Sequence, residues 1–304
     1  MKFYERRKMN SLKKGDKIAV VAPSGQIGDY EKIKNGMQYL ENLGFEPVFG
    51  RHVYAKKRYM AGTDQERAND VNAAFADPKI KAVFCVRAAA GATRILRHID
   101  YIKIRKNPKP LIGFCDNAAL QAALFKKSKI VSYNGFLPTY DFKNGNADSL
   151  VKESLEKLLR GETYSIHSGE KLRGGKAKGR LLCINLSTLM YLAGTPYFPE
   201  LKGKILLLED VNEKIYKIDL MLQQLKQQPH FHQLNGVIFG QFTNCTGDEE
   251  DGTLEDCFED FLQGTDFPAI KDFQFGHVAQ RYVLPYGGRV KMLADESKLE
   301  ILNY

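Results

Sequence analysis

The alternation of short apolar runs with helix-like segments in the first half of the chain is the feature that most constrains its fold. The apolar runs are nearly continuous in Val, Ile, Leu and Phe, as expected for strands whose two faces are both covered. They occupy residues 17–24, 46–50, 81–88, 110–115 and 129–135. Strand–helix alternation of this kind predicts an open, mostly parallel α/β sheet, with ligands bound outside the carboxyl ends of its strands.

Two helices are predicted between these strands. Residues 30–44 have apolar side chains at helical spacing and close on Gly44, a residue type that commonly follows the last turn of a helix. Residues 65–77 have a helical pattern that ends just before Pro78, and a helix usually stops before the residue that precedes a proline.

The second half of the chain has a different pattern. Residues 141–178 combine one short amphipathic helix (149–160) with polar segments rich in Gly and Lys, which is typical of a linker between domains. Further apolar runs follow, and a closing series of short strands is predicted from the segment "FQFGH" to the final "KLEILNY". We therefore predict an N-terminal α/β domain (1–140), a linker (141–178) and a smaller, β-rich C-terminal domain (179–304).

Composition narrows the classes of function. The chain has 304 residues, 43% of them hydrophobic, which is enough for a core in each of two domains. Lys and Arg number 45 against 36 Asp and Glu, giving a formal net charge of +9. The basic residues are dispersed and no RNP, zinc-finger or heptad pattern accompanies them, so we expect a surface that favours anionic ligands rather than nucleic acid.

Cysteine usage and the N-terminus indicate the compartment. The five cysteines are an odd number without a C-x-x-C pair, which favours neither a disulfide framework nor a zinc site and fits a reducing environment. The basic N-terminus is followed by an apolar run that is too short for a signal peptide or a membrane span. We predict a cytoplasmic protein with no membrane partner, no metal and no cofactor.

Cys115 lies on an abrupt corner between the apolar run 110–115 and an alanine-rich helical segment. Gly113 and the small residues of the helix allow a tight strand-to-helix turn, a geometry that exposes the side chain of a nucleophile. Amides at the helix N-terminus would favour the anionic thiolate. The alternative is a buried core residue, and the local sequence alone favours it, because cysteine is among the most buried residue types.

A resemblance that covers nearly the whole chain shifts this balance toward a nucleophile. Six blocks occur in the order seen in the LD-carboxypeptidases, the muramoyltetrapeptide carboxypeptidase family of serine peptidases, to which microcin-immunity peptidases are related. They are "GDKIAVVAPSG" (15–25), residues 62–100, "LIGFCDNAAL" (111–120), "GRLLCINLSTLMYLAGTPY" (179–197), residues 203–225 and "FGHVAQRYVLPYG" (275–287). The resemblance implies the two domains named above, a homodimer, and a metal-independent Ser–His–Glu triad that removes the terminal D-alanine of a murein tetrapeptide.

Carried over residue by residue, the resemblance implies a triad in this chain. The nucleophile of the family's G-[YF]-S-D block falls on Cys115, the glutamate of its L-E-[DE]-x block on Glu209 and the histidine of its F-G-H block on His277. His277 would take the proton of the nucleophile and return it to the leaving amine, while Glu209 would orient the imidazole. Taken singly, either residue is more often structural, but their occurrence together inside matching blocks favours catalysis.

The resemblance also places substrate- and oxyanion-binding groups at Arg87, Ala88, Ala89 and Asp116. The family's R-G-G-[YF]-G stretch reads "RAAAG" here (87–91). Alanine keeps the backbone N–H that an oxyanion hole needs, but it does not easily adopt a positive φ and its methyl group takes up room. Arg87 is a candidate for binding the terminal carboxylate of a substrate, with a structural ion pair as the equal alternative.

Three functions stay open at this point. The first is an LD-carboxypeptidase acting on murein stem peptides, with cysteine in place of serine. The second is a microcin-immunity-type peptidase that cleaves a peptidyl-nucleotide amide, and the absence of tryptophan counts against it because some of those proteins stack the nucleobase on one. The third is a non-catalytic protein that binds wall peptides, which the alanines of "RAAAG" favour.

Overall fold

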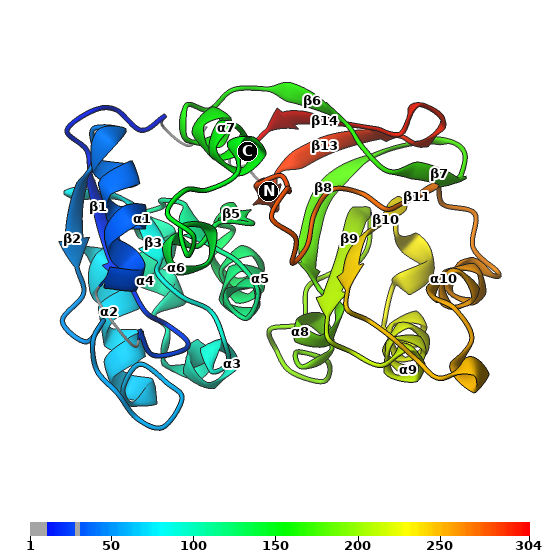
Figure 1. The fold of residues 1–304 in the computed structure, drawn as a ribbon, viewed down its shortest axis with the longest axis horizontal. Coiled ribbons are helices and arrows are strands. Elements are labelled where there is room, and N and C mark those ends of the chain that lie inside the picture. Colours follow the sequence, from blue (N-terminus) through cyan, green and yellow to red (C-terminus); the bar gives the residue numbers. More distant parts are fainter. Residues whose placement is uncertain (1–10, 28–30) are drawn as a thin grey trace.

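The computed structural model describes residues 11–27 and 31–304. Residues 1–10, where the predicted N-terminal domain starts with basic residues, and residues 28–30, just before the first helix, lie outside the described part. The described chain forms two sheets with their helices, one on the left and one on the right of Figure 1.

The first sheet contains the five parallel strands that the apolar runs predict, so the expected α/β fold is confirmed. Its strand order is β12-β5-β4-β3-β1-β2, and β12 alone runs antiparallel to its neighbour. The elements of this half are β1 (Lys17–Val21), α1 (Glu31–Asn42), β2 (Glu46–Phe49), α2 (Asp64–Ala76), β3 (Ile80–Cys85), α3 (Ala92–Ile95), α4 (Tyr101–Lys106), β4 (Leu111–Gly113), α5 (Asn117–Ser128), β5 (Ser132–Asn134) and α6 (Pro138–Asp141).

Both faces of this sheet are buried, which explains the continuous apolar runs. Alternate side chains of β1 point to opposite faces, as in any strand. Ile18 and Val20 belong to a core that includes residues of α1, whereas Ala19 and Val21 belong to a second core that includes residues of α2. Helices therefore cover both faces of the sheet at β1.

The two predicted helices are confirmed as α1 and α2. Helix α2 starts at a capping box, in which the side chain of Thr63 accepts from the N–H of Glu66 and the Glu66 carboxylate accepts from the N–H of Thr63. It ends at Ala76, directly before the residue that precedes Pro78. The capping box fixes the first turn of α2, which carries Asp64 and Arg67.

The second sheet has eight strands in the order β6-β14-β13-β8-β9-β10-β11-β7. The central strands β8 to β11 are parallel, and the outer strands are antiparallel. The elements are α7 (Ser149–Leu159), β6 (Tyr164–His167), β7 (Glu170–Arg173), β8 (Lys176–Asn185), α8 (Leu186–Met190), β9 (Lys204–Val211), α9 (Ile215–Lys226), β10 (Gly236–Thr243), α10 (Leu254–Leu262), β11 (Ala269–Lys271), β12 (Leu284–Tyr286), β13 (Arg289–Leu293) and β14 (Lys298–Asn303).

The segment predicted to be a linker, residues 141–178, is folded over most of its length. Helix α7 places Val151 and Leu155 in the same core as Ile18 and Val20 of the first half. Strands β6 and β7 form the two edges of the second sheet. The segment therefore connects the two halves, because α7 packs against the first half and β6 and β7 pair with the second sheet. The limits of the two domains stay a prediction.

The end of the chain crosses back to the first half. Strand β12 pairs with β5 of the first sheet, whereas β13 and β14 pair within the second. The prediction of a strand at "FQFGH" (273–277) is wrong, because β11 ends at Lys271 and residues 273–277 form a loop. That loop lies between the last parallel strand of the second sheet and the crossing strand β12, so it lies where the two halves meet.

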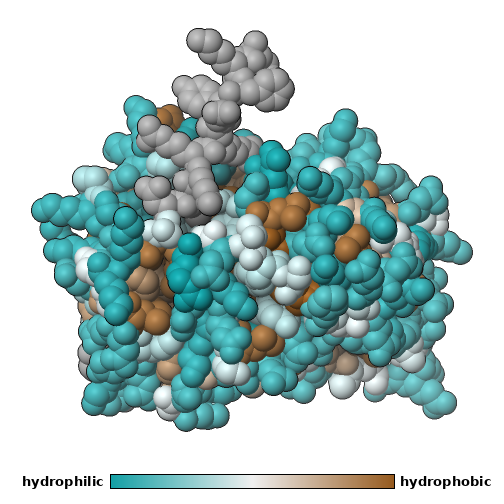
Figure 2. Space-filling model, turned by 90° about the horizontal axis from the view of Figure 1, so that it is seen from above, coloured by the Kyte–Doolittle hydropathy of each residue, from teal (hydrophilic) through white to brown (hydrophobic). Residues whose placement is uncertain are grey.

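The surface seen from above is mostly hydrophilic, with small, separate apolar areas between the polar side chains (Figure 2). Among the residues that the structure describes, no helix has both the length and the apolar character needed to cross a membrane.

Candidate active site

The predicted nucleophile, Cys115, lies two residues after the end of β4, at the carboxyl end of the parallel strands. Its φ of 58° is in the left-handed region, which residues other than glycine adopt rarely and often at functional sites. Helix α5 starts two residues later, so the chain turns sharply from strand to helix at the cysteine. This agrees with the corner predicted from the sequence. All five cysteines are free, and Cys115 is the one that is not buried.

Glu209 and His277 are direct neighbours. Glu209 lies near the end of β9 and is fully buried, and its Oε2 is 2.8 Å from Nδ1 of His277. Gly276, which precedes the histidine, has a φ of 143°. A Cβ at position 276 would lie 2.9 Å from the Gln241 carbonyl oxygen and 3.2 Å from Glu209 Oε2. Glycine is therefore required in the F-G-H sequence, because it lets the loop bring the imidazole onto the carboxylate.

The imidazole of His277 interacts with both Glu209 and Cys115. Burial by itself lowers the pKa of His277, but hydrogen bonds to Cys115 and Glu209 and the charges of these two groups outweigh it and raise the pKa to about 10. The ring of Phe114 packs against the imidazole, with 4.6 Å between ring centroids. The raised pKa favours the protonated form of the imidazole. The structure brings all three predicted triad residues together.

A pocket of about 440 Å³ includes the exposed side of this group. Arg87 and Lys143 contribute positive charge, and Lys143 Nζ lies 4.8 Å from the centre of the Tyr140 ring. None of the described residues that line the pocket is acidic. The lining residues are Ile27, Arg87, Ala88, Ala89, Phe114, Cys115, Leu137, Thr139, Tyr140, Lys143 and His277. The pocket therefore suits an anionic ligand.

A separate pocket of about 400 Å³ lies elsewhere, with Leu12, Phe45 and Arg160 among its lining residues. It contains neither a cysteine nor a histidine among the described residues, so it offers no nucleophile beside a base. Among residues 11–27 and 31–304, no three His, Cys, Asp or Glu side chains are grouped in a way that could hold a metal ion.

The predicted oxyanion loop (87–91) lies beside Cys115. Ala88 is buried and its carbonyl oxygen accepts from the N–H of Gly25 at 3.1 Å. Because the peptide bond is trans, the N–H of Ala89 points away from Gly25. Ala89 itself has a φ of 110°, a conformation that costs an alanine strain and that a glycine adopts freely. The substitution of alanine for the family's glycine therefore leaves the loop strained but in place.

Two backbone donors near the nucleophile are unused. Neither the N–H of Ala89 nor the N–H of Asp116 donates to another described residue. The N–H that follows a nucleophile, together with one from a neighbouring strand-to-helix loop, makes the oxyanion hole in enzymes with this type of turn. In their positions along the chain, one directly after Cys115 and one in the loop after β3, these two N–H groups match that pattern.

Asp116 is among the residues predicted to bind substrate or oxyanion, but its side chain lies outside the pocket. Its buried carboxylate accepts from the hydroxyl of Ser24 and from the N–H of Ala92, the latter at 2.8 Å. Burial raises the pKa of Asp116, and these hydrogen bonds oppose that shift. The side chain of Asp116 therefore fixes the loop that follows Ala89, and a role of this residue in binding substrate or oxyanion stays a prediction.

Arg281 is a site residue that the sequence analysis missed. Its side chain is fully buried between the two halves, with Nη2 2.5 Å from Asp141 Oδ1 of α6, Nε donating to the Gly135 carbonyl and Nη1 to the Val278 carbonyl. Its guanidinium also lies over the ring of Phe114, 4.8 Å from the ring centre. From the sequence alone an arginine is expected to be exposed to solvent. The position of Arg281 inside the block 275–287 is the one sequence feature that could have indicated a role in the site.

The sequence matches the models of two domain families over most of its length. Residues 18–135 match the LD-carboxypeptidase N-terminal domain, and residues 178–292 match the LD-carboxypeptidase C-terminal domain. The chain belongs to the LD-carboxypeptidase family. The chain is also 33% identical, over 296 residues, to a probable murein peptide carboxypeptidase of Bacillus subtilis, covering 95% of this chain and 92% of that protein.

Two further comparisons show the breadth of the family. The crystal structure of a muramoyltetrapeptide carboxypeptidase from Oxalobacter formigenes superposes with a TM-score of 0.87 at 26% identity and covers 95% of this chain and 99% of that one. The microcin C7 self-immunity protein of Escherichia coli is 24% identical over 299 residues, covering 88% of this chain and 86% of that protein. The resemblance stated from the sequence is confirmed, and a solved structure of the microcin C7 self-immunity protein also superposes on this chain, with a TM-score of 0.86 at 24% identity and 98% of each chain covered.

The environment of the cysteines predicts selective alkylation of Cys115. The other four cysteines are buried, and burial raises the pKa of each, to about 11 for Cys245 and Cys257. We expect iodoacetamide at neutral pH to modify Cys115 first and Cys115→Ala to abolish the fast phase, as measured by peptide mass spectrometry. Cys257→Ala is the control and should leave the fast phase unchanged. Equal rates at all cysteines would contradict the prediction.

The raised pKa of His277 predicts a pH dependence of stability. Because the folded pKa is about 10 against an ordinary value of 6.5, protonated His277 stabilises the fold fully below about pH 6.5 and this contribution is lost as the pH rises through about 10. Glu209→Gln removes one cause of the shift. Urea unfolding should therefore show that the advantage of the wild type over Glu209→Gln shrinks between pH 6.5 and 10. His230→Gln, on an exposed histidine, is the control. A constant difference would argue against the charged pair.

The strain at Ala89 predicts a stabilising substitution. Ala89→Gly removes strain of about 1–3 kcal/mol and adds about 0.5–1 kcal/mol of unfolded-state entropy, so a net gain of about 1 kcal/mol is expected. Ala90→Gly, in the same loop without a positive φ, should instead lose stability. Chemical denaturation of both variants measures the difference. If the two glycines have the same effect, Ala89 carries no strain.

Proposed function

We propose that this protein is an LD-carboxypeptidase that releases the terminal D-alanine of murein tetrapeptides, with Cys115 as its nucleophile. The observation that carries the proposal is a pocket lined by Cys115, His277 and two cationic side chains, with no acidic residue among the described lining residues, and with the buried Glu209 bonded to His277 behind it. A carboxypeptidase must bind a free terminal carboxylate next to its nucleophile. Arg87 and Lys143 are suited to that role.

The reaction follows from the groups in place. The Cys115 sulfur attacks the carbonyl carbon of the bond between the L-centre and the D-residue, and the N–H groups of Ala89 and Asp116 stabilise the oxyanion. His277 gives its proton to the leaving amine, so D-alanine departs and a thioester remains. A water molecule then attacks the thioester while His277 accepts its proton. The C–S bond breaks, the tripeptide is released, and the free Cys115 sulfur again lies beside a protonated His277. Glu209 orients the imidazole and stabilises its charged form throughout.

The microcin-immunity type of activity is the second candidate. Tyr140 lines the pocket and its ring is a surface on which a nucleobase could stack, in a chain without tryptophan. A catalytically inactive wall-peptide-binding protein is the third, and the strain at Ala89 is the observation that favours it. A homodimer, implied by the family resemblance, and a cytoplasmic location, indicated by the cysteines and the N-terminal segment, remain predictions.

Mass spectrometry of a peptide panel tests the proposal. We expect purified protein to convert a murein tetrapeptide to the tripeptide and D-alanine, to leave the C-terminally amidated tetrapeptide intact and to release no amine from a peptidyl-nucleotide. Cys115→Ala should abolish turnover, and Cys115→Ser should retain measurable activity if the site is still shaped for acyl transfer. Arg87→Lys should raise KM several-fold because lysine cannot form the bidentate pair.

The other outcomes identify the alternatives. Cleavage of the peptidyl-nucleotide without release of D-alanine from the tetrapeptide would contradict the proposal and favour the microcin-immunity type of activity. Binding of the tetrapeptide without turnover by the wild type would favour the wall-peptide-binding protein. Turnover of the amidated peptide at the same rate would show that the cationic side chains do not read the terminal carboxylate.

A further inference from the structure

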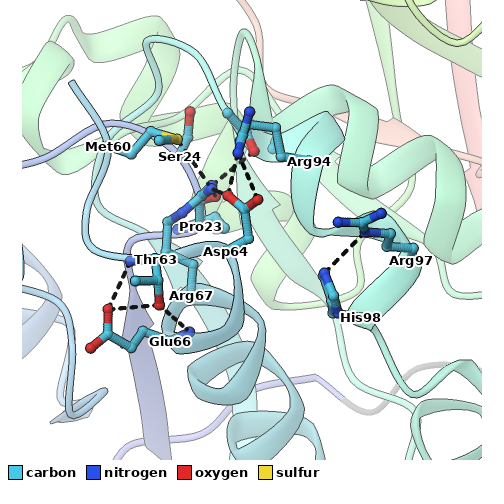
Figure 3. A network of polar contacts seen from close by, with 12 residues as sticks. Pro23, Ser24, Met60, Thr63, Asp64, Glu66, Arg67, Arg94, Arg97 and His98 are labelled. Carbon is cyan, nitrogen blue, oxygen red and sulfur yellow. Dashed lines mark hydrogen bonds and ion pairs between the residues drawn. The ribbon is translucent and has the colours of Figure 1, made fainter. Parts of the chain in front are cut away.

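Arg67 is the centre of a polar network that includes Pro23, Met60 and Asp64 (Figure 3). It lies on the first turn of α2, and its side chain is fully buried. Its Nη1 donates to the carbonyl oxygens of Pro23 at 2.6 Å and Gly91 at 2.8 Å. Its Nη2 donates to the Asp64 carboxylate at 2.5 Å and contacts Met60 Sδ at 3.3 Å. One guanidinium thus joins the loops after β1 and β3 to helix α2.

The contacts of Arg67 and Asp116 converge on one peptide unit. The carbonyl oxygen of Gly91 accepts from Arg67, and the N–H of Ala92, on the same peptide, donates to Asp116. Ser24, next to the Pro23 that Arg67 also holds, donates to the same carboxylate. Both ends of the peptide between residues 91 and 92 are therefore fixed by buried charged groups. This peptide follows Ala89 by two residues, so its orientation sets the end of the loop that carries the free N–H.

The charge on Arg67 is maintained despite its burial. Burial lowers the pKa of Arg67, and the charge of Asp64 and its hydrogen bond oppose that shift. Asp64 is itself held by a bidentate contact with Arg94, at 2.9 and 2.8 Å. The planar guanidinium reaches two carbonyls and one carboxylate at once, and an ammonium group lacks this geometry.

We infer that Arg67 is a positioning residue for the oxyanion hole, acting through the Gly91 carbonyl on the backbone of the loop 88–91. The inference rests on the proposed function in assigning the loop's N–H to the oxyanion. Arg67 touches no substrate and is separate from the pocket lining. It keeps the alanine-substituted loop in the conformation that the family's glycines would adopt without strain.

The variants Arg67→Lys and Arg94→Lys form a matched pair. Both weaken a contact to Asp64, but only the first removes the donor to Gly91. For Arg67→Lys we expect a loss of kcat of about 10- to 100-fold with KM changed less than threefold, since removing one oxyanion donor costs about 100- to 1,000-fold. The alkylation rate of Cys115 by iodoacetamide should stay unchanged, because that reaction forms no oxyanion. Arg94→Lys should keep both rates.

Hydrogen exchange of the peptide spanning 88–92 gives a readout that needs no substrate. It should be faster in Arg67→Lys than in Arg94→Lys. If exchange and kcat are both unchanged in Arg67→Lys, or if Cys115 alkylation falls together with kcat, the inference is wrong. Should Arg67→Lys fail to fold, Arg67→Gln tests the same contact to Gly91 with a neutral side chain that is shorter than arginine; unchanged exchange and kcat in that variant would overturn the inference.

The same measurements separate this inference from the proposed function. p-Nitrophenyl acetate is hydrolysed through an oxyanion without any peptide specificity. If the wild type cleaves the ester but no murein peptide, the proposed substrate fails and the ester kinetics still judge Arg67. If the wild type cleaves neither, the proposed enzyme activity fails, and the exchange rates alone decide whether Arg67 holds the loop.

Discussion

The site depends on a single buried cation that bridges the two halves of the molecule. Cys115 comes from the first sheet and His277 from a loop of the second half, so their relative position is set by whatever joins these halves. Arg281 binds Asp141 and the Gly135 carbonyl on one side and the Val278 carbonyl, next to the histidine, on the other. Removing one partner of a buried ion pair costs about 3–5 kcal/mol, because the other charge is left uncompensated. The contact is therefore suited to hold one register between the halves.

Covalent topology reinforces this contact. Strand β12 starts three residues after Arg281 and pairs with β5, so the loop that carries His277 is fixed to the first sheet at its far end. At its near end it follows β11, a strand of the second sheet. A loop anchored on both halves has little freedom, and this is consistent with a histidine that must meet a carboxylate from one half and a thiol from the other.

Much of this could be predicted from the sequence, and the exceptions share a cause. The strands β1 to β5 and the helices α1 and α2 follow from local periodicity, and the triad residues follow from the family blocks. The crossing of β12 could not be predicted, because three residues carry no signal of which sheet they join. Arg67 and Arg281 could not be predicted as buried, because burial of a charge depends on partners distant in sequence. The contacts of the Asp116 side chain with Ser24 and Ala92 could not be predicted either, because both partners are distant in sequence.

The two departures from the family pattern act on the same step of the chemistry. In the proposed reaction a thiol is a stronger nucleophile than a hydroxyl group, so Cys115 would depend less on accurate proton abstraction than a serine. Stabilisation of the oxyanion would then matter more, and the proposed donors include the N–H of Ala89 in the strained loop. A positive φ at an alanine persists only where its surroundings determine it more strongly than its own preference does. Three contacts fix the loop on either side of Ala89. The N–H of Gly25 binds the Ala88 carbonyl, the guanidinium of Arg67 binds the Gly91 carbonyl, and the carboxylate of Asp116 binds the N–H of Ala92.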